Sequence, residues 1–215
     1  MNFEELTKLW NIYIPQNNSL FPFPENTSPE LINIETKEIT DYLVELFSYL
    51  TKKAKIRDNW EYKFETTHYD TSITAISKKQ KHEYTFGIFD GDLYIESYIL
   101  EPKNIKLMTS EFWLVLSKLD LIKSFSFQED SVLSDSITFD KNTGKASVYR
   151  LVRNYVLLKE HQPNDVTNLG RYHASWSLTE SLNEIQNDVI GTFKGIHKLN
   201  YLSYRREYQK HQKKA

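Results

Sequence analysis

The chain of 215 residues contains no cysteine. Without thiols it can form neither a disulfide nor a thiolate zinc site, and a cysteine nucleophile is excluded. Glycine is scarce, with six residues, and no G-x-G sequence occurs. Loops that cradle phosphates need glycine because backbone N–H groups must approach the ligand without a Cβ in the way. These absences disfavour dinucleotide sites and Walker-type nucleotide sites.

Long apolar runs are also missing. The sequence has no stretch of about 18 apolar residues, the length needed to span a bilayer. The first residues lack the basic segment and apolar run of a signal peptide. We therefore expect a cytoplasmic protein with no membrane contact. Abundant Lys, Asn, Ile and Tyr are typical of the A/T-rich codons of a low-GC bacterium or its phage.

What is present suffices for a hydrophobic core. Hydrophobic residues make up 40% of the chain and aromatic residues 14%, which excludes disorder over most of its length. A chain of this length fits one domain, so we expect a single domain over residues 1–215. It would carry an N-terminal helix and a proline-rich segment within 1–35, and a basic helical tail at 200–215.

Short aromatic and β-branched segments recur through residues 60–100 and are separated by polar turns. This pattern predicts an antiparallel β-meander. Asp90 and Gly91 favour a tight hairpin turn between its last two strands. Alternation at 124–127 and 136–139 predicts further strands, so the sheet is expected to extend over 124–158. Residues 146–158 fit a helix or a strand, and the turn residues at 140–145 favour a strand for their first half.

Amphipathic helices are expected to pack on this sheet, which gives an α+β fold. Pro29 follows a serine and marks a helix start. Apolar stripes at helical spacing then predict helices over 39–53 and 107–122. Residues 161–176 are predicted to form a loop. Ser177 and Glu180 match a capping box that would open a long C-terminal helix, in which Gly191 and Gly195 each cost about 1 kcal/mol relative to alanine.

Three residues suggest catalytic chemistry. Asp92, Glu101 and Lys103 resemble the acidic and E-x-K elements of the PD-(D/E)xK nuclease family. The resemblance implies two carboxylates on adjacent strands that hold Mg²⁺ and a lysine that stabilises the attacking hydroxide. Pro102 departs from the pattern, because it lies where the family continues a strand and it has no N–H to donate to the sheet. A chain with 26% charged residues also produces such patterns by chance.

A second group of residues suggests binding. Arg171, Tyr172, His173 and Trp176 gather a guanidinium, an imidazole and two aromatic rings just before the expected long helix. Arg, Tyr and Trp make most binding hot spots, so we predict that this cluster contacts a partner. The alternative is a loop that its aromatic side chains anchor to the core.

The functional interpretation is a non-catalytic protein-binding module, for example an inhibitor, an immunity protein or an accessory protein. It rests on the missing motifs and on the abundance of Tyr, Phe and Trp, which are enriched at interfaces. No cofactor and no metal are expected, since the histidines show no metal-ligand spacing. The alternative is a metal-dependent nuclease or a nucleic-acid binder. The basic tail would then bind phosphates, but a net charge of −2 disfavours this.

Overall fold

The computed structural model of the chain describes residues 29–66, 70–89, 91–99, 102–129, 146–161 and 169–212. The predicted N-terminal helix and the turn expected at 140–145 lie outside these residues, as does the strand expected at 136–139. Among the described helices, none combines the length and the apolar composition that crossing a membrane requires.

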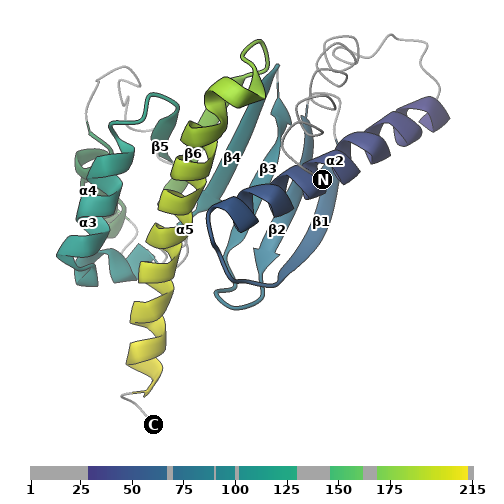
Figure 1. Ribbon diagram of the computed structural model, residues 1–215. Helices are drawn as coiled ribbons and strands as arrows, with labels where there is room; N and C mark the ends of the chain where they lie inside the picture. The colour runs from purple at the N-terminus through teal and green to yellow at the C-terminus, as the bar shows by residue number, and fades with distance from the viewer. Residues whose placement is uncertain are drawn as a thin grey trace. The chain divides into compact units, whose positions relative to one another are not determined.

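Six strands form one antiparallel sheet (Figure 1). Its order is β1-β2-β3-β4-β6-β5. The strands are β1 (Trp60–Thr66), β2 (Asp70–Ser77), β3 (Glu83–Phe89), β4 (Asp92–Tyr98), β5 (Phe125–Glu129) and β6 (Gly170–Ser177). The sheet confirms the predicted α+β class and the predicted meander. Gly91, between β3 and β4, has a φ of 79°, which a tight turn demands and which glycine adopts without strain.

Four α-helices and one 3₁₀-helix accompany the sheet in the described residues. They are α2 (Pro29–Lys53), η1 (Pro102–Leu107), α3 (Ser110–Leu119), α4 (Ser147–His161) and α5 (Leu182–Gln212). The start of α2 at Pro29 and the long C-terminal helix confirm two predictions. The helix predicted over 107–122 exists in shortened form as α3.

Residues 147–161 form the helix α4, so the expected strand in their first half is wrong. The side chains of Leu151 and Asn154 are buried, whereas those of Val152 and Val156 are exposed. That burial has the period of a helix and not of a strand. The Ser147 N–H, which has no partner within the helix, donates to Asp120 Oδ2 at 2.7 Å, and this bond stabilises the start of the helix.

Residues 170–177 form the strand β6, so the loop expected up to residue 176 is also wrong in this part. Burial alternates along β6 at every second residue, as it does in a strand with one face against a core. The capping box of α5 lies four residues later than expected. Ser181 N–H donates to Glu184 Oε2 at 3.2 Å, and Glu184 N–H donates to Ser181 Oγ at 3.4 Å.

The chain divides into two compact units. The first comprises residues 1–95 and 175–193. Within it, α2 packs on β1, β2 and β3 (Figure 1), and the predicted apolar stripe of α2 faces the sheet. Phe47 is fully buried, and its ring centroid lies 5.0 Å from that of Trp60 and 5.2 Å from that of Phe193. Tyr84 also contacts Phe193, at 5.8 Å. Aromatic rings therefore form the centre of this unit.

The second unit comprises residues 96–174 and 194–215. Here α3 packs against α4, and α4 packs against β5. A Cβ added at Gly195 of α5 would lie 2.5 Å from a methyl carbon of Leu119. The buried Asn200 of α5 donates from Nδ2 to Ser97 Oγ of β4 at 2.7 Å. The C-terminal half of α5 is thus anchored by close packing at one point and by a buried hydrogen bond at another.

Helix α2 ends with a residue in an uncommon conformation. Lys55 has a φ of 58°. The Ile56 N–H donates to Thr51 O at 2.9 Å and the Lys55 N–H to Lys52 O at 3.1 Å. This pair of bonds is a Schellman motif, in which glycine is the favoured residue because a Cβ is strained at positive φ.

Lys55→Gly should therefore raise the free energy of unfolding by about 1 kcal/mol, because it removes the strain of a Cβ at positive φ. Urea titration of the variant and of the wild type measures the change. Lys53→Gly is the matched control. It removes the same charge, but from a helical position, and should lower stability by about 0.5–1 kcal/mol. A loss of stability in both variants would contradict the strain argument.

Candidate functional site

Strands β5 and β6 bring polar side chains together in the second unit. Ser126 of β5 pairs with His173 of β6, and Gln128 pairs with Arg171. Directly paired residues in an antiparallel sheet project to the same side. The four side chains therefore share one face, opposite to the face that carries the buried Tyr172.

Strand β4 lies on the other side of β6 and adds a carboxylate. The Ile99 N–H donates to Gly170 O at 3.1 Å. Continuing the antiparallel register from this bond places Glu96 directly opposite His173. The polar face thus extends over three neighbouring strands, with β6 in the middle.

The Glu96 carboxylate contacts two side chains of β6, those of His173 and Arg171. Its Oε1 lies 2.8 Å from His173 Nδ1, and its Oε2 lies 3.1 Å from Arg171 Nη1. Only 13% of the Glu96 side chain and 19% of the His173 side chain are exposed, against 37% for Arg171. Because a carboxylate only accepts hydrogen bonds, His173 Nδ1 carries the proton of their shared bond. Glu96 therefore fixes the orientation of both partners.

Arg171 makes two more contacts. Its Nε donates to Gln128 Oε1 at 3.0 Å, and its Nη1 donates to Tyr98 OH at 3.2 Å. The guanidinium carbon also lies 5.9 Å from the centre of the Tyr98 ring, within range of a cation–π interaction. We call the five residues Glu96, Tyr98, Gln128, Arg171 and His173 the Glu96 cluster.

Glu96 and His173 of the cluster lie in one row with Ser126 across three strands, the sequence of groups that activates a serine nucleophile. Acyl transfer also needs donors that converge on the developing oxyanion. Glu96 engages Arg171 Nη1 and His173 Nδ1, while the guanidinium keeps further N–H groups. The arrangement presents a fixed guanidinium beside an aromatic ring.

The predicted binding residues divide between the two faces of β6. Arg171 and His173 belong to the Glu96 cluster, whereas Tyr172 and Trp176 are 2% and 5% exposed. Burial raises the pKa of the Tyr172 phenol well above its ordinary value. Trp176 Nε1 donates to Asp188 Oδ2 at 2.6 Å. The contact with a partner stays a prediction, and burial favours a structural role for Tyr172 and Trp176.

The described structure includes two of the three predicted nuclease residues, and their coming together stays a prediction. Asp92 begins β4, and Lys103 lies in the 3₁₀-helix η1 instead of a strand. Glu101 is outside the described residues. In the part of the chain that is described, no group of three or more His, Asp or Glu side chains could hold a metal ion.

Sequence reasoning missed Glu96, Tyr98 and Gln128. Side chains alternate between the two faces of a strand, so a strand over residues 93–98 assigns Glu96 and Tyr98 to the same face. The sequence therefore contained a signal for these two residues. The decisive information was the strand order. Residues 99–169 separate β4 from β6 in sequence, and no local pattern shows that the two strands are neighbours.

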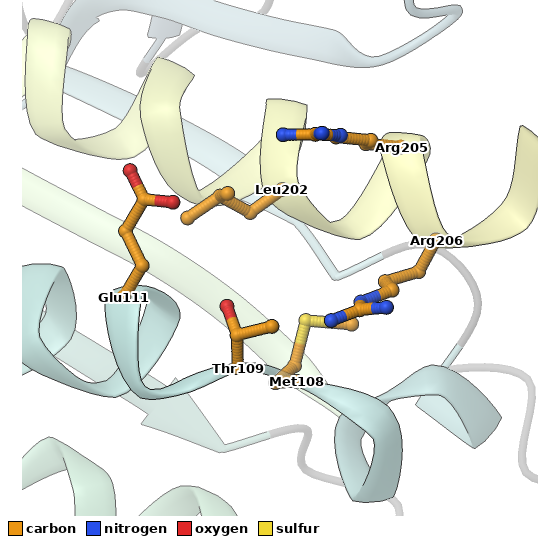
Figure 2. A pocket seen from close by; sticks show the side chains of 6 residues that line it. All are labelled: Met108, Thr109, Glu111, Leu202, Arg205 and Arg206. Carbon is orange, nitrogen blue, oxygen red and sulfur yellow. The ribbon is translucent and has the colours of Figure 1, made fainter. Parts of the chain in front are cut away.

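A hollow of about 180 Å³ lies between the start of α3 and the C-terminal half of α5 (Figure 2). Its lining residues are Met108, Thr109, Glu111, Leu202, Arg205 and Arg206. Lys198 Nζ lies 2.8 Å from Glu111 Oε1. The hydrogen bond and the charge of Lys198 hold the pKa of the Glu111 carboxyl below its ordinary value, and Arg205 adds to this effect. The hollow thus combines two arginines of the predicted basic tail with an acidic side chain.

Comparison of the chain with protein-family models, with curated proteins and with solved structures finds no match. The functional argument therefore depends on the residues of the chain itself. Within the described structure, two predicted binding residues, Arg171 and His173, are held in place by hydrogen bonds and an ion pair in the Glu96 cluster.

Proposed function

We propose that the protein is a non-catalytic protein-binding module and that the Glu96 cluster contacts its partner. The observation that carries the proposal is the fixed and partly exposed pair of Arg171 and Tyr98. The Arg171 side chain is 37% exposed and Tyr98 is 43% exposed. Arg and Tyr are enriched among binding hot spots. Because Glu96 and Gln128 already hold the guanidinium, binding would cost little side-chain entropy.

An apolar stripe on α4, in the same unit, supports an interface. Tyr149, Val152 and Val156 are 50%, 42% and 45% exposed. Their spacings of three and four residues place them on one side of the helix. Contiguous apolar surface of this kind marks interaction sites more often than ordinary protein surface. The stripe is thus a second surface of this unit that is suited to a protein contact.

The proposal covers an inhibitor, an immunity protein or an accessory protein of a low-GC bacterium or phage, acting in the cytoplasm. Its origin and its location rest on the sequence arguments given above. The nuclease alternative gains no support from the described residues. The nucleic-acid-binding alternative does gain an observation, the exposed cationic side chains at the end of α2 and in the β2–β3 turn.

Arg171→Ala should weaken the complex with the partner by about 1–3 kcal/mol, because it removes a pre-ordered hot-spot side chain. Arg171→Lys should behave nearly as Arg171→Ala, since an ammonium keeps the charge but loses the planar fork. Tagged wild-type and variant proteins, used as bait in the same extract at limiting concentration, measure the difference in recovered partner.

Lys118→Ala is the control for this experiment, since Lys118 is an exposed residue of α3. It should recover as much partner as the wild type. Thermal unfolding of each bait checks that the fold is intact. Equal recovery by Arg171→Ala and by the wild type would show that the Glu96 cluster is not the contact surface.

A further inference from the structure

Two loops of the first unit gather cationic side chains at one end of the sheet. One is the end of α2 with the segment that follows it, and the other is the turn between β2 and β3 (Figure 1). All of these cationic side chains are exposed. We call the group the basic patch; its members are Lys52, Lys53, Lys55, Arg57, Lys78, Lys79 and Lys81.

Hydrogen bonds hold the two loops together. The Lys78 N–H donates to Asn59 O at 2.9 Å. Asp58 accepts from Ser77 Oγ at 2.5 Å through Oδ2 and from the Lys79 N–H at 3.3 Å through Oδ1. Asp58 is thus the acidic side chain that joins the loops, and both of its oxygens are used within the protein. The basic patch is a fixed arrangement built from segments about 20 residues apart in sequence.

A broad depression of about 550 Å³ opens between these loops. Arg57, Lys78 and Lys79 line it together with Asp58 and Asn59. None of the seven cationic side chains forms an ion pair with another residue whose position is described. Lys53 instead lies 5.4 Å from the centre of the Tyr49 ring. Clustered like charges produce a local positive potential that attracts anions.

The backbone gives a second indication that charge matters here. Lys55 and Lys81 have φ angles of 58° and 62°, and they are the described non-glycine residues with positive φ. Glycine would adopt both conformations without strain. Both positions nevertheless carry lysine, and both belong to the basic patch. Strained backbone of this kind concentrates at functional sites.

We propose that the basic patch binds the phosphate backbone of double-stranded nucleic acid. Exposed lysines are point charges suited to phosphates, whereas protein interfaces are depleted in lysine. The residues that line the depression include no aromatic side chain on which unpaired bases could stack, as they do in single-strand binders. Contacts of this type fix position without selecting sequence. The members of the patch belong to the first unit and none belongs to the Glu96 cluster, so the inference goes beyond the proposed protein contact.

The basic patch also changes an expectation from the sequence. The sequence disfavours nucleic acid because the net charge is −2 and basic residues concentrate in the C-terminal tail. Folding brings the end of α2 next to the β2–β3 turn and creates a second concentration of positive charge. The negative net charge of the whole chain does not describe this surface.

The test is equilibrium binding of the full chain to random-sequence duplex DNA, followed by fluorescence anisotropy over a range of salt concentrations. The affinity should fall steeply with salt, because each phosphate contact releases a condensed counterion. Lys78→Gln combined with Lys79→Gln should weaken binding at low salt by about tenfold or more. It should also reduce the slope of log affinity against log salt by about 2, since two phosphate contacts are lost.

Lys118→Gln combined with Lys123→Gln is the matched control. It changes the net charge equally, at exposed lysines of the second unit, and should leave affinity and slope unchanged.

Equal weakening by both double variants would overturn the proposal, as would absence of duplex binding at low salt. Tighter binding to single-stranded DNA would overturn the duplex assignment. Displacement by polyglutamate at the same charge concentration would indicate an acidic protein, and binding only to phosphatidylserine vesicles would indicate a membrane surface.

Discussion

Trp176→Ala should lower the free energy of unfolding by about 3–5 kcal/mol. Trp176 is 5% exposed, and it lies on the buried face of β6. Removing the indole leaves a cavity, and it also removes the N–H that donates to Asp188 at 2.6 Å. A partly buried carboxylate that loses a donor adds to the cost. Urea unfolding followed by circular dichroism measures the change.

Trp176→Phe separates the two contributions. It keeps a six-membered aromatic ring and loses the N–H donor with the small remainder of the indole, so we expect a loss of about 1–2 kcal/mol. The sequence alone predicted that Trp176 contacts a partner. If Trp176→Ala kept the stability within about 1 kcal/mol and abolished partner binding instead, that prediction would be right and the structural role assigned here would be wrong.

Two glycines of α5 should respond to the same substitution with opposite signs. Gly191→Ala should raise the free energy of unfolding by about 0.5–1 kcal/mol, because its Cβ would meet no atom within 4 Å and alanine favours the helix. Gly195→Ala should lower it by about 1–2 kcal/mol. There the Cβ would lie 2.5 Å from Leu119, and overpacking outweighs the gain in helix propensity. Thermal or urea unfolding of the two single variants measures the pair.

A double-mutant cycle identifies the cause. In a Leu119→Ala background the clash is gone, so Gly195→Ala should become stabilising by about the amount expected at Gly191. A loss of stability at Gly195 that persists without the Leu119 side chain would refute the packing explanation. Backbone strain would not replace it, since Gly195 lies within a continuous helix.

The sequence predicted the meander well because its signals are local. Alternating apolar residues define each of the strands β1 to β4, and Gly91 supplies the turn that joins β3 to β4. The strand β6 carried the same signal, since Tyr172, Ala174 and Trp176 are the buried residues at every second position. Its polar members, Arg171 and His173, suggested a loop. A strand in the middle of a sheet can still carry charged residues where a neighbouring strand provides Glu96.

The remaining errors have physical causes of a similar kind. Residues 177–184 contain S-x-x-E twice in succession, and the sequence does not say which copy caps α5. Ser177 ends β6, so the second copy, Ser181 and Glu184, is used. The start of α4 depends on Asp120, a residue distant in sequence. Such tertiary contacts override local propensity.

The candidate site was half predictable. Arg171 and His173 were identified from residue types alone, but their partners come from β4 and β5 and depend on strand order. The basic patch was unpredictable for the same reason, since its two halves meet only when β1 and β2 pair. In both cases the sequence contained the charges and the fold decided which of them act together.

The discontinuity of the first unit has a consequence for synthesis on the ribosome. Its core needs Phe193, which packs against Phe47 and Tyr84. A nascent chain that has reached Ile95 therefore exposes aromatic rings whose partner has not been made. Phe193 is made roughly 100 residues later, which is roughly 5–20 s at about 5–20 residues per second. During that interval the emerging strands need protection by a chaperone or by the ribosome surface.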